Sequence, residues 1–275
     1  NHVFYSNRAA AYMAMEKFER ALRDANECVR LQPTWAKGYS RQAAAFLSMG
    51  DLQAARDACM RGLDLEPENT QVKEELRRVE IAESLALKDA ATEAFKGQDY
   101  EKAVEDLTSA IRLDSTNQVF FSNRSVAYTA MQLYEKALED ADECVRLQPT
   151  WAKGYSRKGA ALFRMDKLAG ARDAFEQGLD LDRDNATYVR CTKQELQLVM
   201  DAIAQRKEES LEFKERAIEA FNVQNFKRAE QHLSSAIELD PENHVFYSNR
   251  AAAYMAMEKF ERALRDANEC VRLQP

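Results

Sequence analysis

Five polar side chains in the middle of the chain have the types and spacing to bind a carboxylate together. Lys88 and Thr92 are four residues apart, Asn123 follows, and Lys153 and Arg157 are again four residues apart. Residues spaced by four lie on one face of a helix. Three cations and an amide suit a terminal carboxylate with an acidic side chain beside it, because charge-assisted hydrogen bonds to a carboxylate contribute about 1.5–3 kcal/mol each.

The composition of the chain argues against most other kinds of site. Its 275 residues carry 39 Lys and Arg against 46 Asp and Glu, with only 8 Gly and 5 Pro. An acidic chain without a basic block disfavours nucleic acid, scarce glycine disfavours a phosphate loop, and no apolar run approaches the roughly 18 residues of a membrane span. No nucleophile–base pair, metal-ligand spacing or cofactor motif is present, so we expect no enzyme, no catalytic residue, no metal and no cofactor. The five cysteines form no Cys-x-x-Cys pair, which favours a reducing, cytoplasmic location.

A 34-residue repeat positions the five polar side chains. Each unit has alanine at its twentieth position, small residues at its eighth and twenty-seventh, and in most units a proline at its thirty-second. Small residues let two antiparallel helices approach closely, and the proline ends the second helix. Such hairpins cannot bury their apolar faces alone and stack into an all-α solenoid, whose first helices line a groove. The units are 2–35, 36–69, 84–117, 118–151, 152–185, 210–243 and the truncated 244–275.

This pattern resembles the tetratricopeptide repeat, which implies a right-handed α-solenoid. The extra residues 70–83 and 186–209 contain no Gly or Pro, so we expect long helices that cap one module and run into the next, although a kink near residues 208–210 is equally compatible. The predicted domains are a partial module at 1–83, a complete three-repeat module with its capping helix at 84–209, and the start of another module at 210–275.

The chain also contains a longer repeat. Residues 243–275 are identical to residues 1–33, so the sequence consists of one 242-residue period and 33 residues of the next. We therefore expect a window cut from a longer array, with further copies of its own modules as partners.

The local strings resemble the carboxylate clamp of Hop-type co-chaperone modules. They are Tyr-Ser-Asn-Arg at 5–8 and 247–250, Phe-Ser-Asn-Arg at 121–124, and Lys-Gly-Tyr-Ser-Arg at 37–41 and 153–157. The resemblance implies that the groove binds the acidic C-terminal tails of heat-shock chaperones. In the complete module the clamp is Lys88, Thr92, Asn123, Lys153 and Arg157, and the equivalent partial sites are Asn7, Lys37, Arg41, Lys214 and Asn249.

The sequence departs from the clamp at one position. The family's first-repeat Asn is Thr92 in the complete module and Ile218 in the next one. A threonine hydroxyl could still donate a hydrogen bond, whereas isoleucine cannot. The loss of one such contact costs about 1 kcal/mol or more, which could weaken binding about tenfold.

Other interpretations of these residues stay open. Lys and Arg on helix faces are commonly solvated charges, and Phe95 and Phe221 either contact the apolar side chains of a bound peptide or complete the inner wall of the groove. The main rival to peptide binding is an architectural array whose clamp residues are idle. A designed array is a third possibility.

Overall fold

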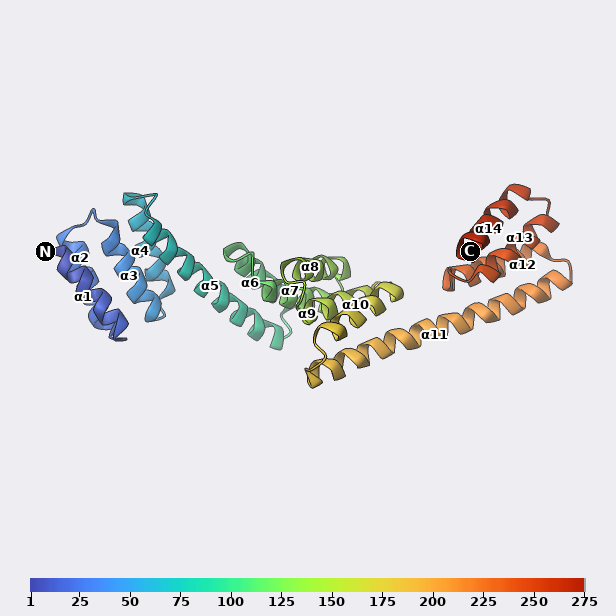
Figure 1. The fold of residues 1–275 in the computed structure, drawn as a ribbon, viewed down its shortest axis with the longest axis horizontal. Coiled ribbons are helices and arrows are strands. Elements are labelled where there is room, and N and C mark those ends of the chain that lie inside the picture. The colour runs from blue at the N-terminus through green and yellow to red at the C-terminus, as the bar shows by residue number, and fades with distance from the viewer. Residues whose placement is uncertain (275) are drawn as a thin grey trace. The chain divides into compact units, whose positions relative to one another are not determined.

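The computed structural model describes residues 1–274, and within them every regular element is an α-helix (Figure 1). The predicted all-α fold of helical hairpins is confirmed. None of the helices in this part of the chain has the length and apolar character needed to cross a membrane. The helices are α1 (His2–Ala14), α2 (Phe18–Leu31), α3 (Ala36–Ser48), α4 (Leu52–Leu65), α5 (Thr70–Lys96), α6 (Tyr100–Leu113), α7 (Gln118–Ala130), α8 (Tyr134–Leu147), α9 (Ala152–Arg164), α10 (Leu168–Leu181), α11 (Ala186–Asn222), α12 (Phe226–Leu239), α13 (His244–Ala256) and α14 (Phe260–Leu273).

The chain forms two compact units, residues 1–161 and 162–275. In the first unit each helix from α1 to α8 packs against the next, and α3 also contacts α1 and α5. In the second unit α10 to α14 pack in the same sequential order. The proposed module boundaries near 83 and 209 fall inside α5 and α11, so the division into three modules stays a prediction.

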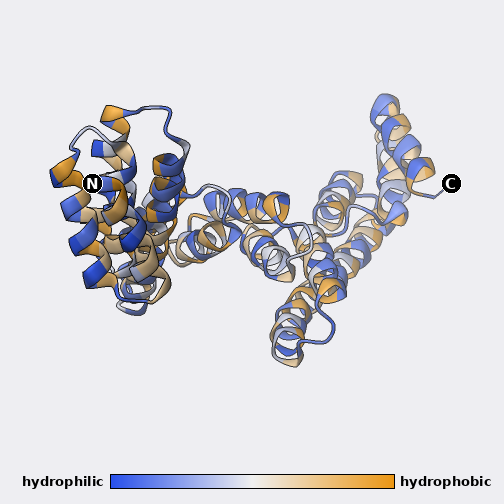
Figure 2. Ribbon diagram, turned by 60° about the vertical axis from the view of Figure 1, so that its left-hand side comes forward, coloured by the Kyte–Doolittle hydropathy of each residue, from blue (hydrophilic) through white to orange (hydrophobic). Residues whose placement is uncertain are grey.

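Small residues form the contact surface within each hairpin. The alanine at the twentieth position is buried in all seven units. Apolar and polar residues alternate along the helical ribbons (Figure 2), and the buried core consists mainly of alanine and other apolar residues. This pattern is what stacked amphipathic helices require. The seven alanines are Ala21, Ala55, Ala103, Ala137, Ala171, Ala229 and Ala263.

The two long linking helices are present as predicted. Asn69 caps α5 by accepting a hydrogen bond from the backbone of Val72 at 3.1 Å, and Asn185 caps α11 in the same way. The α5 helix is 27 residues long and α11 is 37, and residues 208–210 lie within the continuous α11. At one end of α5, Val72 and Val79 are fully buried against α3 and α4, so this end caps the preceding hairpin.

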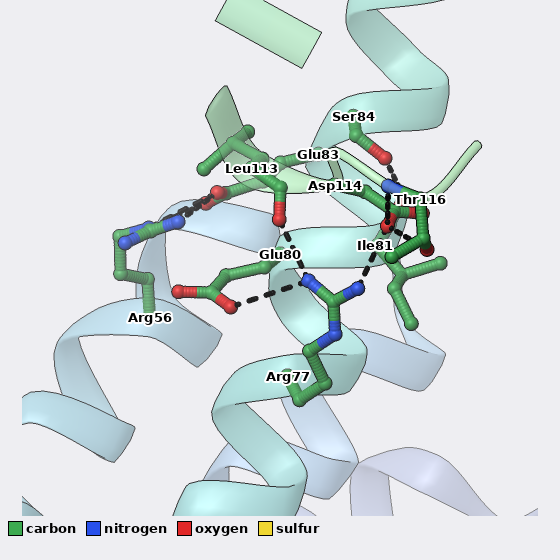
Figure 3. A network of polar contacts seen from close by, with 9 residues as sticks. All are labelled: Arg56, Arg77, Glu80, Ile81, Glu83, Ser84, Leu113, Asp114 and Thr116. Carbon is green, nitrogen blue, oxygen red and sulfur yellow. Dashed lines mark hydrogen bonds and ion pairs between the residues drawn. The ribbon is translucent and has the colours of Figure 1, made fainter. Parts of the chain in front are cut away.

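A polar network holds the middle of α5 between two hairpins (Figure 3). On one side Arg56 of α4 forms an ion pair with Glu83 of α5. On the other side Arg77 donates to the backbone carbonyl of Leu113, the last residue of α6, and to Asp114 Oδ1, both at 2.7 Å. A cation on the last carbonyls of a helix is favourable because those groups have no partner within the helix. The linking helix is therefore fixed to the hairpin on each side of it.

The carboxylate of Asp114 is a pH-sensitive part of this network. Burial alone would raise the pKa of Asp114, but hydrogen bonds from Thr116 and Arg77 outweigh burial and hold the pKa below its usual value. A depressed folded-state pKa means that the contribution to stability is complete above the ordinary Asp pKa of about 3.9 and is lost as pH falls through the lower folded value.

We therefore expect Asp114→Asn to lower the free energy of unfolding at pH 7 by about 1–3 kcal/mol. The difference from the parent chain should shrink as pH falls below about 4, because the parent then loses the same charge. Urea unfolding at pH 7, 4 and 2.5 measures this. Asp64→Asn, at an exposed carboxylate, is the matched control. A difference that stays constant with pH would contradict the role of the ionised Asp114.

Three hairpins contain a second recurring ion pair, and a fourth hairpin keeps only the aspartate of this pair. Arg124 donates to both carboxylate oxygens of Asp140 at 2.7 and 2.8 Å, and the same pair links Arg8 with Asp24 and Arg250 with Asp266. In the hairpin α5–α6 the arginine position is Ala90. There Asp106 Oδ2 is buried without a hydrogen-bond partner among residues 1–274.

Ala90→Arg should therefore stabilise the protein by about 1 kcal/mol, because the new guanidinium gives Asp106 the partner that its equivalents have. Thermal or urea unfolding of the full chain measures the gain. Ala90→Gln is the control, since glutamine has a similar helix propensity but no charge. Equal stabilities of the two variants, or a gain that survives Asp106→Ala, would rule out this pairing.

Candidate functional site

A pocket on the inner surface of the first unit contains three of the five predicted clamp residues. Thr92 of α5, Asn123 of α7 and Arg157 of α9 line it together. Its volume is about 530 Å³ and it opens to solvent. Three helices that are distant in sequence thus contribute one polar group each to a single concave surface. The remaining wall is apolar and consists of Ala91, Phe95, Ala103, Leu107 and Val126.

The two predicted lysines lie beside this pocket and not in its wall. Lys88 is one helical turn before Thr92, and Lys153 is one turn before Arg157, so both lie on the same helix faces as the residues in the pocket. Lys88 forms an ion pair with Asp89 at 2.8 Å, and Lys153 is exposed. A ligand that engages Lys88 must displace Asp89, at small cost because exposed ion pairs contribute about 0–1 kcal/mol.

Arg157 is held at the pocket by the neighbouring hairpin. Its Nε donates to Ser122 Oγ of α7 at 3.3 Å, and its side chain is half-buried. Ser122 directly precedes Asn123, so one turn of α7 both positions the arginine and supplies the amide. On the neighbouring helix α8, burial raises the pKa of the Cys144 thiol to about 12. Its Sγ donates a hydrogen bond to the backbone carbonyl of Gln118, the first residue of α7. The thiol is thus protonated near neutral pH and is not a nucleophile.

The hydroxyl proton of Thr92 is already engaged in a hydrogen bond within α5. Thr92 Oγ1 donates to the carbonyl of Lys88 at 2.9 Å, so it offers a ligand an acceptor and no proton. This differs from the expectation that the threonine could donate. The reason is local, because a threonine within a helix can reach the carbonyl four residues before it. A carboxylate in this pocket would therefore meet an unfavourable lone pair unless the hydroxyl rotates.

The second unit contains the same pocket with a different polar content. Ala217, Phe221 and Leu233 replace Ala91, Phe95 and Leu107, and Asn249 is the equivalent of Asn123. Ile218 lies where Thr92 lies in the first pocket, and the volume is about 520 Å³. The second pocket is thus of similar size, but an aliphatic side chain replaces the hydroxyl and no arginine lines it.

The partial sites are divided between the units. Lys214 is half-buried on α11 and Asn249 on α13, whereas Asn7, Lys37 and Arg41 belong to α1 and α3 of the first unit. Asn7 is exposed, and Arg41 Nε is buried without a hydrogen-bond partner within residues 1–274. A role of these five residues as partial clamp sites stays a prediction.

Part of the pocket wall was not predicted from the sequence. Ala91, Leu107, Val126 and the supporting Ser122 were not among the predicted site residues. The serine precedes the asparagine in each Ser-Asn-Arg string, which is the signal that could have identified it. Phe95 lines the pocket, and its ring packs edge-to-face on Tyr100 with the ring centroids 5.1 Å apart, so it is part of the inner wall. Its contact with a bound peptide stays a prediction.

Comparisons with known proteins support the resemblance at the level of sequence. No family model matches the chain. "Heat shock protein STI1" of Saccharomyces cerevisiae is 49% identical over 79 residues, which are 29% of this chain and 13% of that protein. "Stress-induced-phosphoprotein 1" of Caenorhabditis elegans is 33% identical over 199 residues, which are 69% of this chain and 62% of that protein. The sequence is thus similar to these two proteins over part of its length. It spans less than two thirds of the length of these curated relatives.

Among solved structures, a similar chain is the first TPR of Spaghetti (RPAP3) bound to the HSP90 peptide SRMEEVD. It is 31% identical, and the match covers 45% of this chain and 95% of that one with a TM-score of 0.42.

The state of Thr92 leads to a prediction for the Hop-like pocket. Thr92→Asn should strengthen binding of an acidic peptide about tenfold, because an amide donor replaces a hydroxyl whose proton is bound to the helix. Calorimetric titration of the full chain with SRMEEVD measures it. Thr92→Val, which keeps the shape and removes the hydroxyl, is the control and should not strengthen binding as the amide does. If the Asn and Val variants bind the peptide equally well, the lack of a hydrogen-bond donor at position 92 does not limit the affinity of this pocket.

Proposed function

We propose that this protein is an interaction scaffold whose groove binds acidic C-terminal tails, with heat-shock chaperones as the partners. One observation carries the proposal: Thr92, Asn123 and Arg157 from three helices line one pocket, and Lys88 and Lys153 lie one helical turn from it. The relationship to Hop-type co-chaperones supports the same function.

The groups of the site have complementary roles in this proposal. Arg157 and Lys153, together on α9, bind carboxylates through charge-assisted hydrogen bonds, and Asn123 of α7 supplies an amide donor beside them. Lys88 adds a third positive charge once it releases Asp89. The apolar wall at Phe95, Leu107 and Val126 accommodates an apolar side chain of the tail, so charge and shape select the ligand together.

Binding without catalysis, in the cytoplasm, completes the proposal. The thiols of Cys59 and Cys144 are buried, and burial raises the pKa of each to about 12, so neither is an activated nucleophile. All five cysteines are free thiols, which suits a reducing compartment. We infer no cofactor requirement, and no role in binding nucleic acid or membranes.

The test is titration of the full chain with SRMEEVD and with the same peptide carrying an amidated C-terminus. Binding should weaken at least tenfold on amidation and again in the variant Lys153→Ala/Arg157→Ala, because each change removes charge-assisted hydrogen bonds of about 1.5–3 kcal/mol. Lys37→Ala/Arg41→Ala, at the equivalent positions of the incomplete site, is the matched control and should leave binding to the first pocket unchanged. Binding that ignores both amidation and the α9 variant would refute a carboxylate receptor.

An architectural array is the second candidate, and the polar network around α5 favours it. Arg56–Glu83 and Arg77–Asp114 fix the linking helix to both of its neighbours, as a protein that keeps its modules at constant spacing requires. No binding of either peptide would leave this array as the better account.

A further inference from the structure

In the first unit, the C-terminal end of a helix binds a guanidinium group. Arg77 of α5 donates to the backbone carbonyl of Leu113, the last residue of α6, and to Asp114 Oδ1, both at 2.7 Å (Figure 3). Thr116 of the following turn also donates to Asp114 Oδ1 at 2.7 Å. The last carbonyls of a helix have no partner within the helix and carry partial negative charge, so donors at this end are favourable.

The second unit keeps the acceptors of this arrangement and lacks both donors. Leu239 ends α12 and Asp240 follows it, as in the first unit, but Ile203 occupies the repeat position of the arginine and Glu242 that of the threonine. Within residues 1–274 no hydrogen bond or ion pair reaches the carboxylate of Asp240, which is half-buried. The last turn of α12 contains Glu238 and no basic residue, so this turn does not offset the negative end of the helix.

A cavity connects the three positions of the second unit that correspond to the arginine and its two acceptors. Ile203, Leu239 and Asp240 line it together, and Leu168 and Pro241 extend its apolar wall. The cavity has a volume of about 850 Å³, opens to solvent and lies wholly within the second unit, between α10, α11 and the end of α12. Pockets that bind small ligands have volumes of about 300–1,000 Å³, so this cavity is large enough for a side chain of another molecule.

The wall of the cavity also contains three basic residues, two of which already bind a carboxylate. Arg206 forms an ion pair with Asp166, and Arg172 forms one with Asp173 at 2.9 Å. Lys207 is exposed, so water and salt screen its repulsion of another cation. Because two of the three basic groups are paired in this way, the three carboxylates of the wall leave it with an excess of negative charge.

We propose that this cavity binds the arginine side chain of a protein partner. The guanidinium donates to the carbonyl of Leu239 and to the carboxylate of Asp240, in the manner of Arg77 in the first unit, and the aliphatic part of the side chain packs on Ile203. Arginine is favoured over lysine because its planar group reaches two acceptors at once in a fixed geometry. An arginine within a polypeptide suits the site better than the free amino acid, since a free α-carboxylate would meet the carboxylates of the wall. The site is separate from the pocket between α5, α7 and α9 and selects the opposite charge.

The test is a nuclear magnetic resonance titration of the full chain with N-acetyl-arginine N-methylamide. Saturable shifts of the backbone amide resonances of Leu239 and Asp240 are expected. The citrulline analogue has almost the same shape and no charge, so it should bind at least tenfold more weakly. The lysine analogue should also bind more weakly than the arginine compound. Free arginine is the last ligand in the series and separates a free amino acid from an arginine within a polypeptide.

Two variants locate the site, and a third is their matched control. Ile203→Arg should abolish binding, because the new side chain reaches the same acceptors from within the chain, and Asp240→Asn should weaken binding at least tenfold. Ile203→Met keeps an apolar side chain of similar size and should bind the arginine compound as the parent chain does. In contrast to Asp114→Asn, Asp240→Asn should not lower the midpoint of urea unfolding at pH 7, because Asp240 has no donor to lose.

Four results would overturn the proposal. Equal binding of the arginine and citrulline compounds would rule out recognition of the guanidinium charge. Binding that persists in both Ile203→Arg and Asp240→Asn, or shifts confined to residues outside the end of α12, would show that the ligand binds elsewhere. If the parent chain shows no saturable shift, the cavity is not a binding site for arginine. Tighter binding of free arginine than of the blocked compound would make the ligand a small molecule and not a protein.

Discussion

The close approach of two helices at alanine is the contact on which the rest of this structure depends. The alanine at the twentieth position of each unit is buried, and it lets the second helix lie directly on the first. The hairpin that results has apolar residues on both outer faces and cannot cover them alone. Stacking is therefore obligatory, and stacking places α5, α7 and α9 so that Thr92, Asn123 and Arg157 share one pocket. Packing thus assembles the candidate site from residues of three helices that are far apart in the sequence.

The long helix α5 joins stability and function in one element. Its first half covers the core of the preceding hairpin with Val72 and Val79, and its second half supplies Lys88 and Thr92 to the candidate site. Arg77 and Glu83 hold its middle on opposite sides. A helix fixed at several places is a rigid support for a binding residue, so a change at the network around Arg77 can alter the pocket without touching it. This is a mechanical link between the capped hairpin and the groove.

The internal duplication gives two internal comparisons. The pockets in the two units share an alanine, a phenylalanine, a leucine and an asparagine at equivalent positions, whereas Ile218 replaces Thr92 and no arginine corresponds to Arg157. The identical hairpins 1–33 and 243–275 have opposite faces covered, which separates the properties of a sequence from those of its surroundings. In the first comparison the residues of the pocket differ, and in the second the exposure of identical residues differs. The alanine contact inside the hairpin is the same in both comparisons.

The sequence alone determined the repeat, the helices and the positions that could bind a carboxylate. This was possible because helical periodicity, proline and small residues affect only the few residues around them. In the same way, Asn69 and Asn185 cap the two long helices by a hydrogen bond within the first turn. Only the tertiary structure decided how the groups are used. It showed that Thr92 donates to its own helix, that Ser122 holds Arg157, and that Asp89 engages Lys88. It also revealed the pairing of Gly38 with Cys28, which joins neighbouring hairpins. Hydrogen-bond partners and close contacts depend on which atoms meet in space, and a repeat pattern does not specify them.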